Sequence, residues 1–112
     1  MIEGRLWLIR HGQTAWSRSG QHTGRTDLPL EPEGEEQARA VAGRLADTSF
    51  TLVLTSPLVR AIETCRLAGC GADAEVTADL AEWDYGDYEG RTTDDIRTGQ
   101  PGWTLWTDGV PG

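Results

Sequence analysis

The sequence predicts an α/β domain with a mostly parallel sheet and flanking helices. Three short runs rich in apolar or β-branched residues alternate with two longer stretches in which apolar residues recur at helical spacing. The order strand, helix, strand, helix, strand is typical of a parallel sheet, because parallel strands need a crossover connection. In such a sheet, polar segments that follow strands meet at one edge, where sites form.

The first strand is expected at Leu6-Trp7-Leu8-Ile9, an apolar run typical of a strand buried on both faces. The run stops at Arg10. Residues 17–30 are polar and rich in Gly, Ser, Thr and Pro, so we expect a long loop there. A loop of that length inside a small domain usually carries function.

The first helix is expected over residues 31–47. Its apolar residues fall on one face at helical spacing, as Ala38, Val41, Ala42 and Leu45 show. Four glutamates occupy its first turns, where the helix dipole favours negative charge. We interpret this acidic run as a solvated helix start.

The second strand is expected at residues 51–55, and a second helix follows it. Ser56 suits the N-cap, Pro57 suits the first helical position, and the helix is expected to run to about Leu67. The glycines that begin at Gly69 end it. Three of its residues are expected to face inward: Leu58, Ile62 and Cys65.

The remaining residues give weaker patterns. A third strand is expected at residues 75–77, and a short helix at about Thr93 to Thr98 lies within a glycine-rich stretch, 84–112. Cys65 and Cys70 are five residues apart, an offset that gives no close neighbour pair on a helix, and they form no Cys-x-x-Cys motif. We interpret them as free thiols.

The formal net charge of −8 argues against nucleic acid as the main partner. An anionic substrate would need a local basic island on this acidic surface, and all ten basic residues are Arg, the better planar phosphate ligand. No apolar run approaches the roughly 20 residues of a membrane span, and the first residues lack the apolar core of a signal peptide. A cytoplasmic protein without a membrane partner is expected.

Three segments carry groups suited to phosphoryl transfer. Arg10 and His11 follow the first strand, Arg60 lies in the first turn of the second helix, and Glu82 precedes the glycine-rich stretch. Two guanidinium groups can neutralise a phosphate, an imidazole can attack phosphorus, and a carboxyl can protonate the leaving oxygen and later activate water. Each residue alone also has a plain structural interpretation, as a buried His, a surface Arg or a solvated carboxylate.

Taken together, these segments resemble the histidine phosphatase superfamily, also called the phosphoglycerate mutase-like family. Residues 10–16 match its Arg-His-Gly-(Glu/Gln)-Thr-x-Trp signature, and residues 23–30 resemble its Thr-Gly-x-x-Asp-x-x-Leu segment. Residues 34–38 resemble Gly-x-x-Gln-Ala, and 56–64 resemble Ser-x-x-x-Arg-Ala-x-x-Thr. Residues 80–90 resemble Leu-x-Glu-x-x-x-Gly-x-x-(Glu/Gln)-Gly. The motifs occur in order along nearly the whole chain.

The resemblance implies a role for each matched site residue. His11 would be the nucleophile and Glu82 the general acid and base, with no metal and no cofactor. The implied phosphate-binding residues are Arg10, Arg60, Ser17, Thr23 and Gly24. Among these, Thr23 and Gly24 would line the pocket entrance, and Ser17 stands where many members carry an Asn that contacts phosphate.

The chain departs from the family pattern by an absence. The family uses a second His, in a late His-Gly pair, whereas this chain holds only His11 and His22. We interpret His22, in the early loop, as a rim or surface residue. Residues 1–112 are therefore expected to be the N-terminal part of a single histidine phosphatase domain. Such a part would expose apolar surface and is expected to be marginally stable or to self-associate.

The residues that follow Glu82 distinguish a phosphatase from a mutase of this family. Mutases of this family carry Glu-Arg-His-Tyr-Gly, whereas here Trp83 and Asp84 follow Glu82, and Asp84 would repel a substrate carboxylate. We therefore expect a phosphomonoester hydrolase that acts through a phosphohistidine on small phosphorylated metabolites. Mutase-type transfer, or a non-catalytic phosphate-binding fragment, remain the alternatives. Four tryptophans would either line a substrate pocket or pack in the core: Trp16, Trp83, Trp103 and Trp106.

Overall fold

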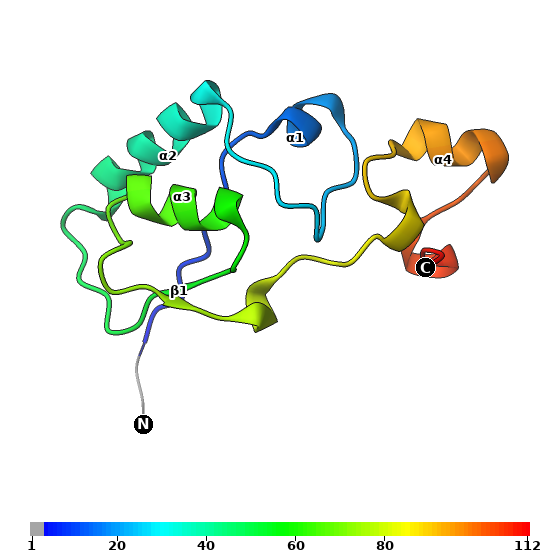
Figure 1. The fold of residues 1–112 in the computed structure, drawn as a ribbon. Coiled ribbons are helices and arrows are strands. Elements are labelled where there is room, and N and C mark those ends of the chain that lie inside the picture. Colours follow the sequence, from blue (N-terminus) through cyan, green and yellow to red (C-terminus); the bar gives the residue numbers. More distant parts are fainter. Residues whose placement is uncertain (1–3) are drawn as a thin grey trace.

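A computed structural model describes residues 4–112 and places two packed helices beside a small sheet (Figure 1). Helix α2 (Pro32–Leu45) packs against α3 (Val59–Leu67). The sheet pairs β1 (Leu54–Thr55) with β2 (Glu75–Val76) in parallel, and Leu54 faces Glu75 in the register. The predicted α/β class with a parallel sheet and flanking helices is confirmed in this reduced form.

Helix α2 forms as its apolar spacing predicts. Pro32 occupies its start, where the missing N–H is no loss. Ala38 and Leu45 are buried, and Val41 and Ala42 are half-buried on the same side. The predicted inward face of this helix is confirmed.

Helix α3 buries a different face from the predicted one. Arg60 and Thr64 are buried, whereas Ile62 is 37% exposed, so the prediction that Ile62 faces inward is wrong. The N-cap prediction is also wrong: the helix begins at Val59, whose N–H donates to Oδ1 of Asp27 at 2.7 Å. A carboxylate from the long loop therefore caps the helix in place of a residue adjacent in sequence.

The expected first strand is absent. Residues 6–9 form no strand, and within residues 4–112 no backbone hydrogen bond joins them to β1. Apolar composition favours burial, but a strand also needs a partner that accepts its N–H groups. Leu6 and Leu8 are each 85% exposed as a result.

The C-terminal third forms a small hydrophobic core of its own. Helix α4 (Thr93–Gly99) confirms the predicted short helix, and a further turn of helix, α5 (Leu105–Asp108), follows it. Tyr88, Ile96 and Trp103 are buried together there. An antiparallel bridge between Gln21 and Thr92 ties the long loop, which begins within α1 (Ala15–Ser19), to this core. Figure 1 shows α1 and the loop between the α2–α3 pair and α4. Two 3-10 turns complete the chain: η1 (Ala78–Leu80) and η2 (Gly86–Tyr88).

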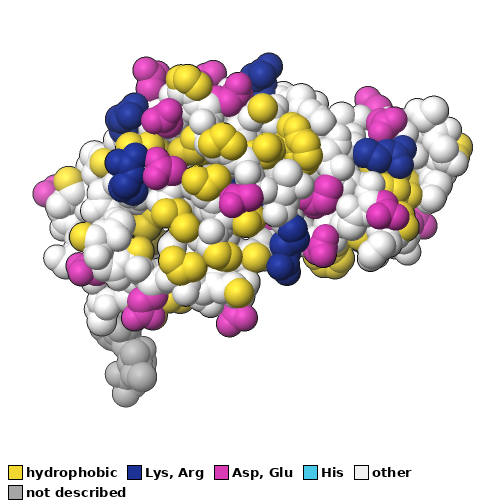
Figure 2. Space-filling view, viewed as in Figure 1, with side chains coloured by type: hydrophobic (Ala, Val, Ile, Leu, Met, Phe, Trp, Pro, Cys, Tyr) yellow, Lys and Arg dark blue, Asp and Glu magenta, His cyan; other side chains and the backbone are white. Residues whose placement is uncertain are grey.

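Apolar side chains remain on the surface of the α2–α3 side. Figure 2 shows hydrophobic side chains gathered on this face between scattered charges. The exposed large apolar residues include Leu6, Leu8, Leu52, Leu54 and Val76.

Within residues 4–112, no helix has the length and apolar character needed to cross a bilayer.

Candidate active site

Three linked hydrogen bonds hold His11 in place. Nδ1 of His11 donates to the carbonyl of Gly12 at 2.7 Å, since a carbonyl only accepts. The Gly12 N–H donates to Oγ1 of Thr64 at 3.0 Å, and the same hydroxyl donates to the carbonyl of Arg60 at 2.7 Å. The histidine segment is thus attached to the first two turns of α3, and Nε2 is the ring nitrogen left for chemistry.

Gly12 is required by close packing against α2. A Cβ at Gly12 would lie 2.3 Å from the carbonyl oxygen of Gly34, and a Cβ at Gly34 would lie 2.2 Å from the carbonyl oxygen of Gln13. Two glycines of the family motifs therefore face each other, where any side chain would push the histidine segment off the helix.

The guanidinium of Arg60 is held by the long loop. Arg60 is 1% exposed, and its charge would be costly to bury without partners. Nη2 donates to the carbonyl of Gly24 at 2.7 Å, and Nη1 donates to the carbonyl of Thr26 at 2.8 Å. Nη2 also donates to Oε2 of Glu82 at 2.8 Å. Loop carbonyls and one carboxylate together fix the direction of the guanidinium.

The carboxylate of Glu82 lies between the ring of His11 and the guanidinium of Arg60. Its Oε2 lies 3.6 Å from Nε2 of His11 and 2.8 Å from Nη2 of Arg60. His11 first, and then Arg60, stabilise the charged form against partial burial, and the pKa of Glu82 falls to about 2. In this state Glu82 is an ionised carboxylate, so a role as general acid requires its pKa to rise when substrate binds.

Glu89 organises the loop that holds Arg60. Its carboxylate accepts hydrogen bonds from the N–H groups of Gly24, Thr26 and Tyr85 and from the hydroxyl of Thr26, at distances of 2.7–3.1 Å. Burial raises the pKa of Glu89, but these hydrogen bonds outweigh it and the net pKa is lowered. Since the Gly24 N–H donates to Glu89, Gly24 acts on the site through its carbonyl.

A cavity of about 290 Å³ opens beside the histidine. Arg10 and Ser17 line it, so the structure brings these two predicted residues together with His11. The hydroxyl of Ser17 also closes a capping box with Thr14, accepting the Thr14 N–H at 2.8 Å. Thr23 is placed differently, because its hydroxyl donates to the carbonyl of Gln21 at 3.1 Å. The residues that line the cavity are Arg10, His11, Gly12, Gln13, Ser17 and Gln37.

The second histidine lies in the C-terminal core. The ring of His22 is half-buried and stacks on Tyr85 with centroids 4.8 Å apart, and Trp103 lies 5.6 Å away. Burial lowers the pKa of His22, with the charge of Glu89 opposing. His22 is therefore half-buried and held by aromatic packing, which the loop sequence does not reveal, and is not a plain surface residue.

The tryptophans divide between core and surface. Trp103 is buried, and Trp16 is half-buried against Gly90. Trp83 and Trp106 are exposed, with ring centroids 6.5 Å apart and nearly perpendicular planes. Across residues 4–112, no group of three or more His, Cys, Asp or Glu side chains is placed to hold a metal ion.

Sequence reasoning missed three residues that support the site. Thr64 and Glu89 were matched as motif positions without a role, and Asp27 as a motif residue only, yet each joins segments far apart in sequence. All three are polar residues at motif positions to which the resemblance assigns no role in the chemistry. That combination was the available signal for a structural hydrogen bond.

The fold and these contacts define an α/β protein with a candidate site built around one histidine, one buried arginine and one carboxylate. The family model of the histidine phosphatase superfamily (branch 1) matches residues 6–112, and the chain belongs to this superfamily.

The relatives carry phosphatase names or the name probable phosphoglycerate mutase GpmB. A protein named acid phosphatase from Mycobacterium tuberculosis is 47% identical over 109 residues, which cover 96% of this chain and 53% of that protein. One named sedoheptulose 1,7-bisphosphatase from Saccharomyces cerevisiae is 38% identical over 128 residues, covering 94% of this chain and 47% of that protein. The chain spans about half the length of the curated relatives it matches.

Solved structures give the same assignment of fold. The structure of the open reading frame Rv3214 from Mycobacterium tuberculosis matches with a TM-score of 0.81 and 45% identity, over 90% of this chain and 53% of that chain. A phosphoserine phosphatase from Entamoeba histolytica, in complex with 3-phosphoglyceric acid, matches with a TM-score of 0.79 and 31% identity, over 92% and 53%. The polypeptide described here therefore has the fold of part of a histidine phosphatase.

Proposed function

We propose that the chain is the N-terminal part of a single histidine phosphatase domain that hydrolyses small phosphomonoesters through a phosphohistidine on His11. The observation that carries the proposal is the contact of one carboxylate, Glu82, with both His11 and Arg60. Stepwise phosphoryl transfer needs a nucleophile, an anion-binding cation and a proton carrier close together, and here the proton carrier contacts the other two groups.

The proposed reaction has two steps. Nε2 of His11 attacks phosphorus, the phosphorus–oxygen bond of the ester breaks, and the leaving oxygen takes a proton from Glu82. Water then attacks phosphorus and gives a proton back to Glu82, the phosphorus–nitrogen bond to His11 breaks, and inorganic phosphate leaves. Arg60 and Arg10 would hold the phosphoryl oxygens throughout.

Glu82 becomes an acid only when phosphate is present. With a pKa of about 2 it is ionised in the empty site. A phosphoryl group takes the hydrogen bond that Arg60 gives to Glu82 and adds negative charge beside the carboxylate, and both changes raise the pKa. The same contact that keeps Glu82 ionised at rest therefore makes its protonation depend on substrate.

The surroundings of Glu82 support a phosphatase over a mutase. Trp83 and Asp84 are both exposed and follow Glu82 directly, so a substrate carboxylate would meet a negative side chain there. Exposed Trp83 and Trp106 offer apolar surface beside this segment. A substrate with a larger or less acidic non-phosphate part suits these groups.

A second candidate is phosphate binding without turnover. It is favoured by the position of His22, which stacks on Tyr85 in the C-terminal core and leaves His11 without a histidine partner in this sequence. A longer chain that supplies such a partner would then be required for hydrolysis.

The test is hydrolysis of p-nitrophenyl phosphate by the chain in the presence of EDTA. Hydrolysis that is lost in His11→Ala and retained in His22→Gln, with an acid-labile phosphoryl group trapped on the wild-type chain, supports the phosphatase. Phosphate binding by calorimetry without hydrolysis selects the second candidate. Full activity in His11→Ala overturns both the nucleophile and the proposal.

A further inference from the structure

Helix α3 ends in a turn that folds one cysteine back onto the other. The helix stops at Leu67, and Gly69 adopts a φ of +88°. The Gly69 N–H donates to the carbonyl of Arg66 at 3.1 Å, and the Cys70 N–H donates to the carbonyl of Cys65 at 3.1 Å. These two bonds form a Schellman motif, in which the side chains at the positions of Cys65 and Cys70 contact each other.

The spacing of the cysteines had predicted the opposite. Two residues that are five positions apart on a continuous helix point in different directions. Here, however, the helix ends between Cys65 and Cys70, and the chain reverses at Gly69. Both thiols are half-buried, and the neighbouring Cys70 helps to raise the pKa of the Cys65 thiol. The backbone hydrogen bond between the two residues keeps their α-carbons within the span of roughly 4.4–6.8 Å that a disulfide bridges.

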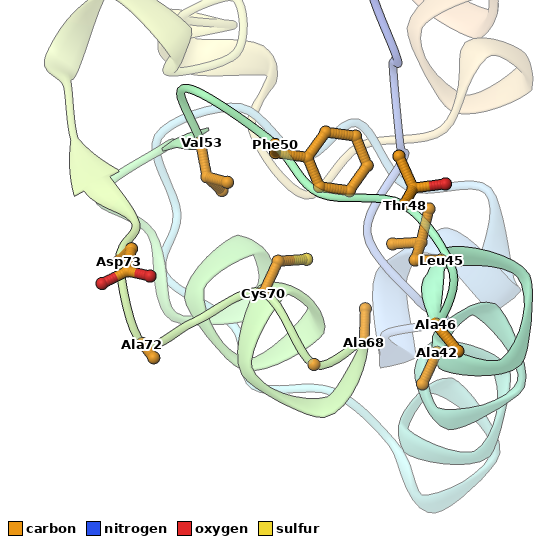
Figure 3. A pocket seen from close by; sticks show the side chains of 11 residues that line it. Ala42, Leu45, Ala46, Thr48, Phe50, Val53, Ala68, Cys70, Ala72 and Asp73 are labelled. Atoms are coloured by element: carbon orange, nitrogen blue, oxygen red, sulfur yellow. The ribbon is translucent and has the colours of Figure 1, made fainter.

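Cys70 is also reachable from solvent. It lines an open cavity of about 280 Å³ together with Phe50, Val53 and Ala68. Figure 3 shows the Cys70 sulfur directed toward the space between these side chains. The cavity shares no lining residue with the one beside His11, so this thiol is separate from the candidate active site.

We propose that Cys65 and Cys70 form a reversible dithiol–disulfide site that a hydroperoxide oxidises. The Cys70 sulfur attacks the O–O bond of hydrogen peroxide, gives up its proton and becomes a sulfenic acid, and one water leaves. The Cys65 sulfur then attacks the Cys70 sulfur, the S–O bond breaks, and the lost hydroxide takes the Cys65 proton to form a second water. Two thiols and one peroxide thus give one disulfide and two waters.

The surroundings of the two cysteines determine which sulfur reacts first with the peroxide. Burial first, and then the neighbouring Cys70, raise the pKa of the Cys65 thiol to about 11, so little Cys65 thiolate exists near neutral pH. Cys65 is therefore a poor first nucleophile for peroxide, and its place is the second step, where contact with Cys70 supplies a high local concentration. Cys70, on the cavity wall, meets the peroxide first.

The experiment treats the intact chain with one equivalent of hydrogen peroxide and follows its mass and free thiols. The expected product is a monomer about 2 Da lighter with no free thiol, restored by dithiothreitol. Cys65→Ser is expected to hold Cys70 as a sulfenic acid that dimedone traps, and Cys70→Ser to react at least several-fold more slowly. Gly69→Ala keeps both thiols but strains the turn, and a roughly ten-fold slower disulfide step is expected.

Three results would overturn the proposal. They are sulfinic acid on the wild-type chain without loss of 2 Da, a disulfide between two chains as the main product, or unchanged disulfide formation in Gly69→Ala. Circular dichroism of each variant shows whether it remains folded, and the wild-type result decides the question if a variant does not.

Discussion

The guanidinium of Arg60 and the carboxylate of Glu82 meet at 2.8 Å, although Arg60 is 1% exposed and the Glu82 side chain is 46% exposed. The same carboxylate oxygen lies 3.6 Å from Nε2 of His11. Glu82 therefore takes up hydrogen-bonding and charge-pairing capacity that a phosphoryl group would use in the proposed reaction. An anion entering the site competes with a carboxylate that is already there.

Glu82→Gln is expected to raise the affinity for inorganic phosphate at neutral pH while abolishing most hydrolysis. The amide removes the negative charge beside Arg60 and His11, so phosphate no longer competes with a carboxylate. It also removes the proton carrier, which is worth roughly 10²–10⁴ in rate. Calorimetric titration with phosphate and the rate of aryl phosphate hydrolysis measure the two effects, and weaker phosphate binding in the variant would contradict the competition.

The stability that Glu82 contributes is expected to depend on acid pH. Its pKa of about 2 in the folded chain lies below its ordinary value of 4.5, so the contribution is full above about pH 4.5 and is lost as the pH falls toward 2. Because the side chain is nearly half exposed, we expect about 1 kcal/mol rather than the full value of the shift. Urea unfolding of the wild-type chain and Glu82→Gln should give curves that converge across this interval, and a constant difference would argue against it.

Thr64→Val is expected to lower both stability and phosphate binding. It keeps the shape of the side chain but removes the hydroxyl that accepts the Gly12 N–H and donates to the Arg60 carbonyl. Leaving a buried N–H without a partner costs about 1–3 kcal/mol. Thr64→Ser keeps the hydroxyl and is the matched control. Equal unfolding free energies for Thr64→Val and Thr64→Ser would show that the link between the histidine segment and α3 is not needed.

Gly12→Ala and Gly43→Ala are expected to change stability in opposite directions. The new Cβ at Gly12 would meet the Gly34 carbonyl at 2.3 Å, so the histidine segment must shift, at a cost of about 1–3 kcal/mol. At Gly43, inside α2, nothing lies within 4 Å, and Ala is expected to stabilise the helix by about 0.5–1 kcal/mol. Denaturant unfolding compares the two variants, and a stable, fully active Gly12→Ala would refute the packing argument.

Much of the candidate site could be predicted because its residues belong to short motifs. His11, Arg60 and Glu82 are far apart in sequence, and the structure brings them into one chain of contacts. The inward face of α2 was equally predictable, since its apolar residues recur at helical spacing and the charged residues between them fall on the other faces of the helix.

The burial of Arg60 could not be predicted in this way. A rule that places charged residues outward put Leu58, Ile62 and Cys65 on the inner face of α3, yet carbonyls of the loop neutralise the cost of burying the guanidinium. The absent strand at residues 6–9 has a related cause, because apolar composition does not supply a hydrogen-bonding partner. Both failures concern contacts made by segments distant in sequence.

The exposed apolar side chains of residues 6–8 are expected to make the chain self-associate. Leu6 and Leu8 are each 85% exposed, and covering one leucine side chain is worth about 1.5–3 kcal/mol. Sedimentation should show a mass that rises with concentration, and replacing Leu6 and Leu8 by Ser should weaken association at least about ten-fold. Trp106→Ser is the control, because Trp106 is 84% exposed but belongs to the C-terminal helix α5. A wild-type chain that stays monomeric at all concentrations and melts cooperatively at high temperature would show that this surface needs no cover.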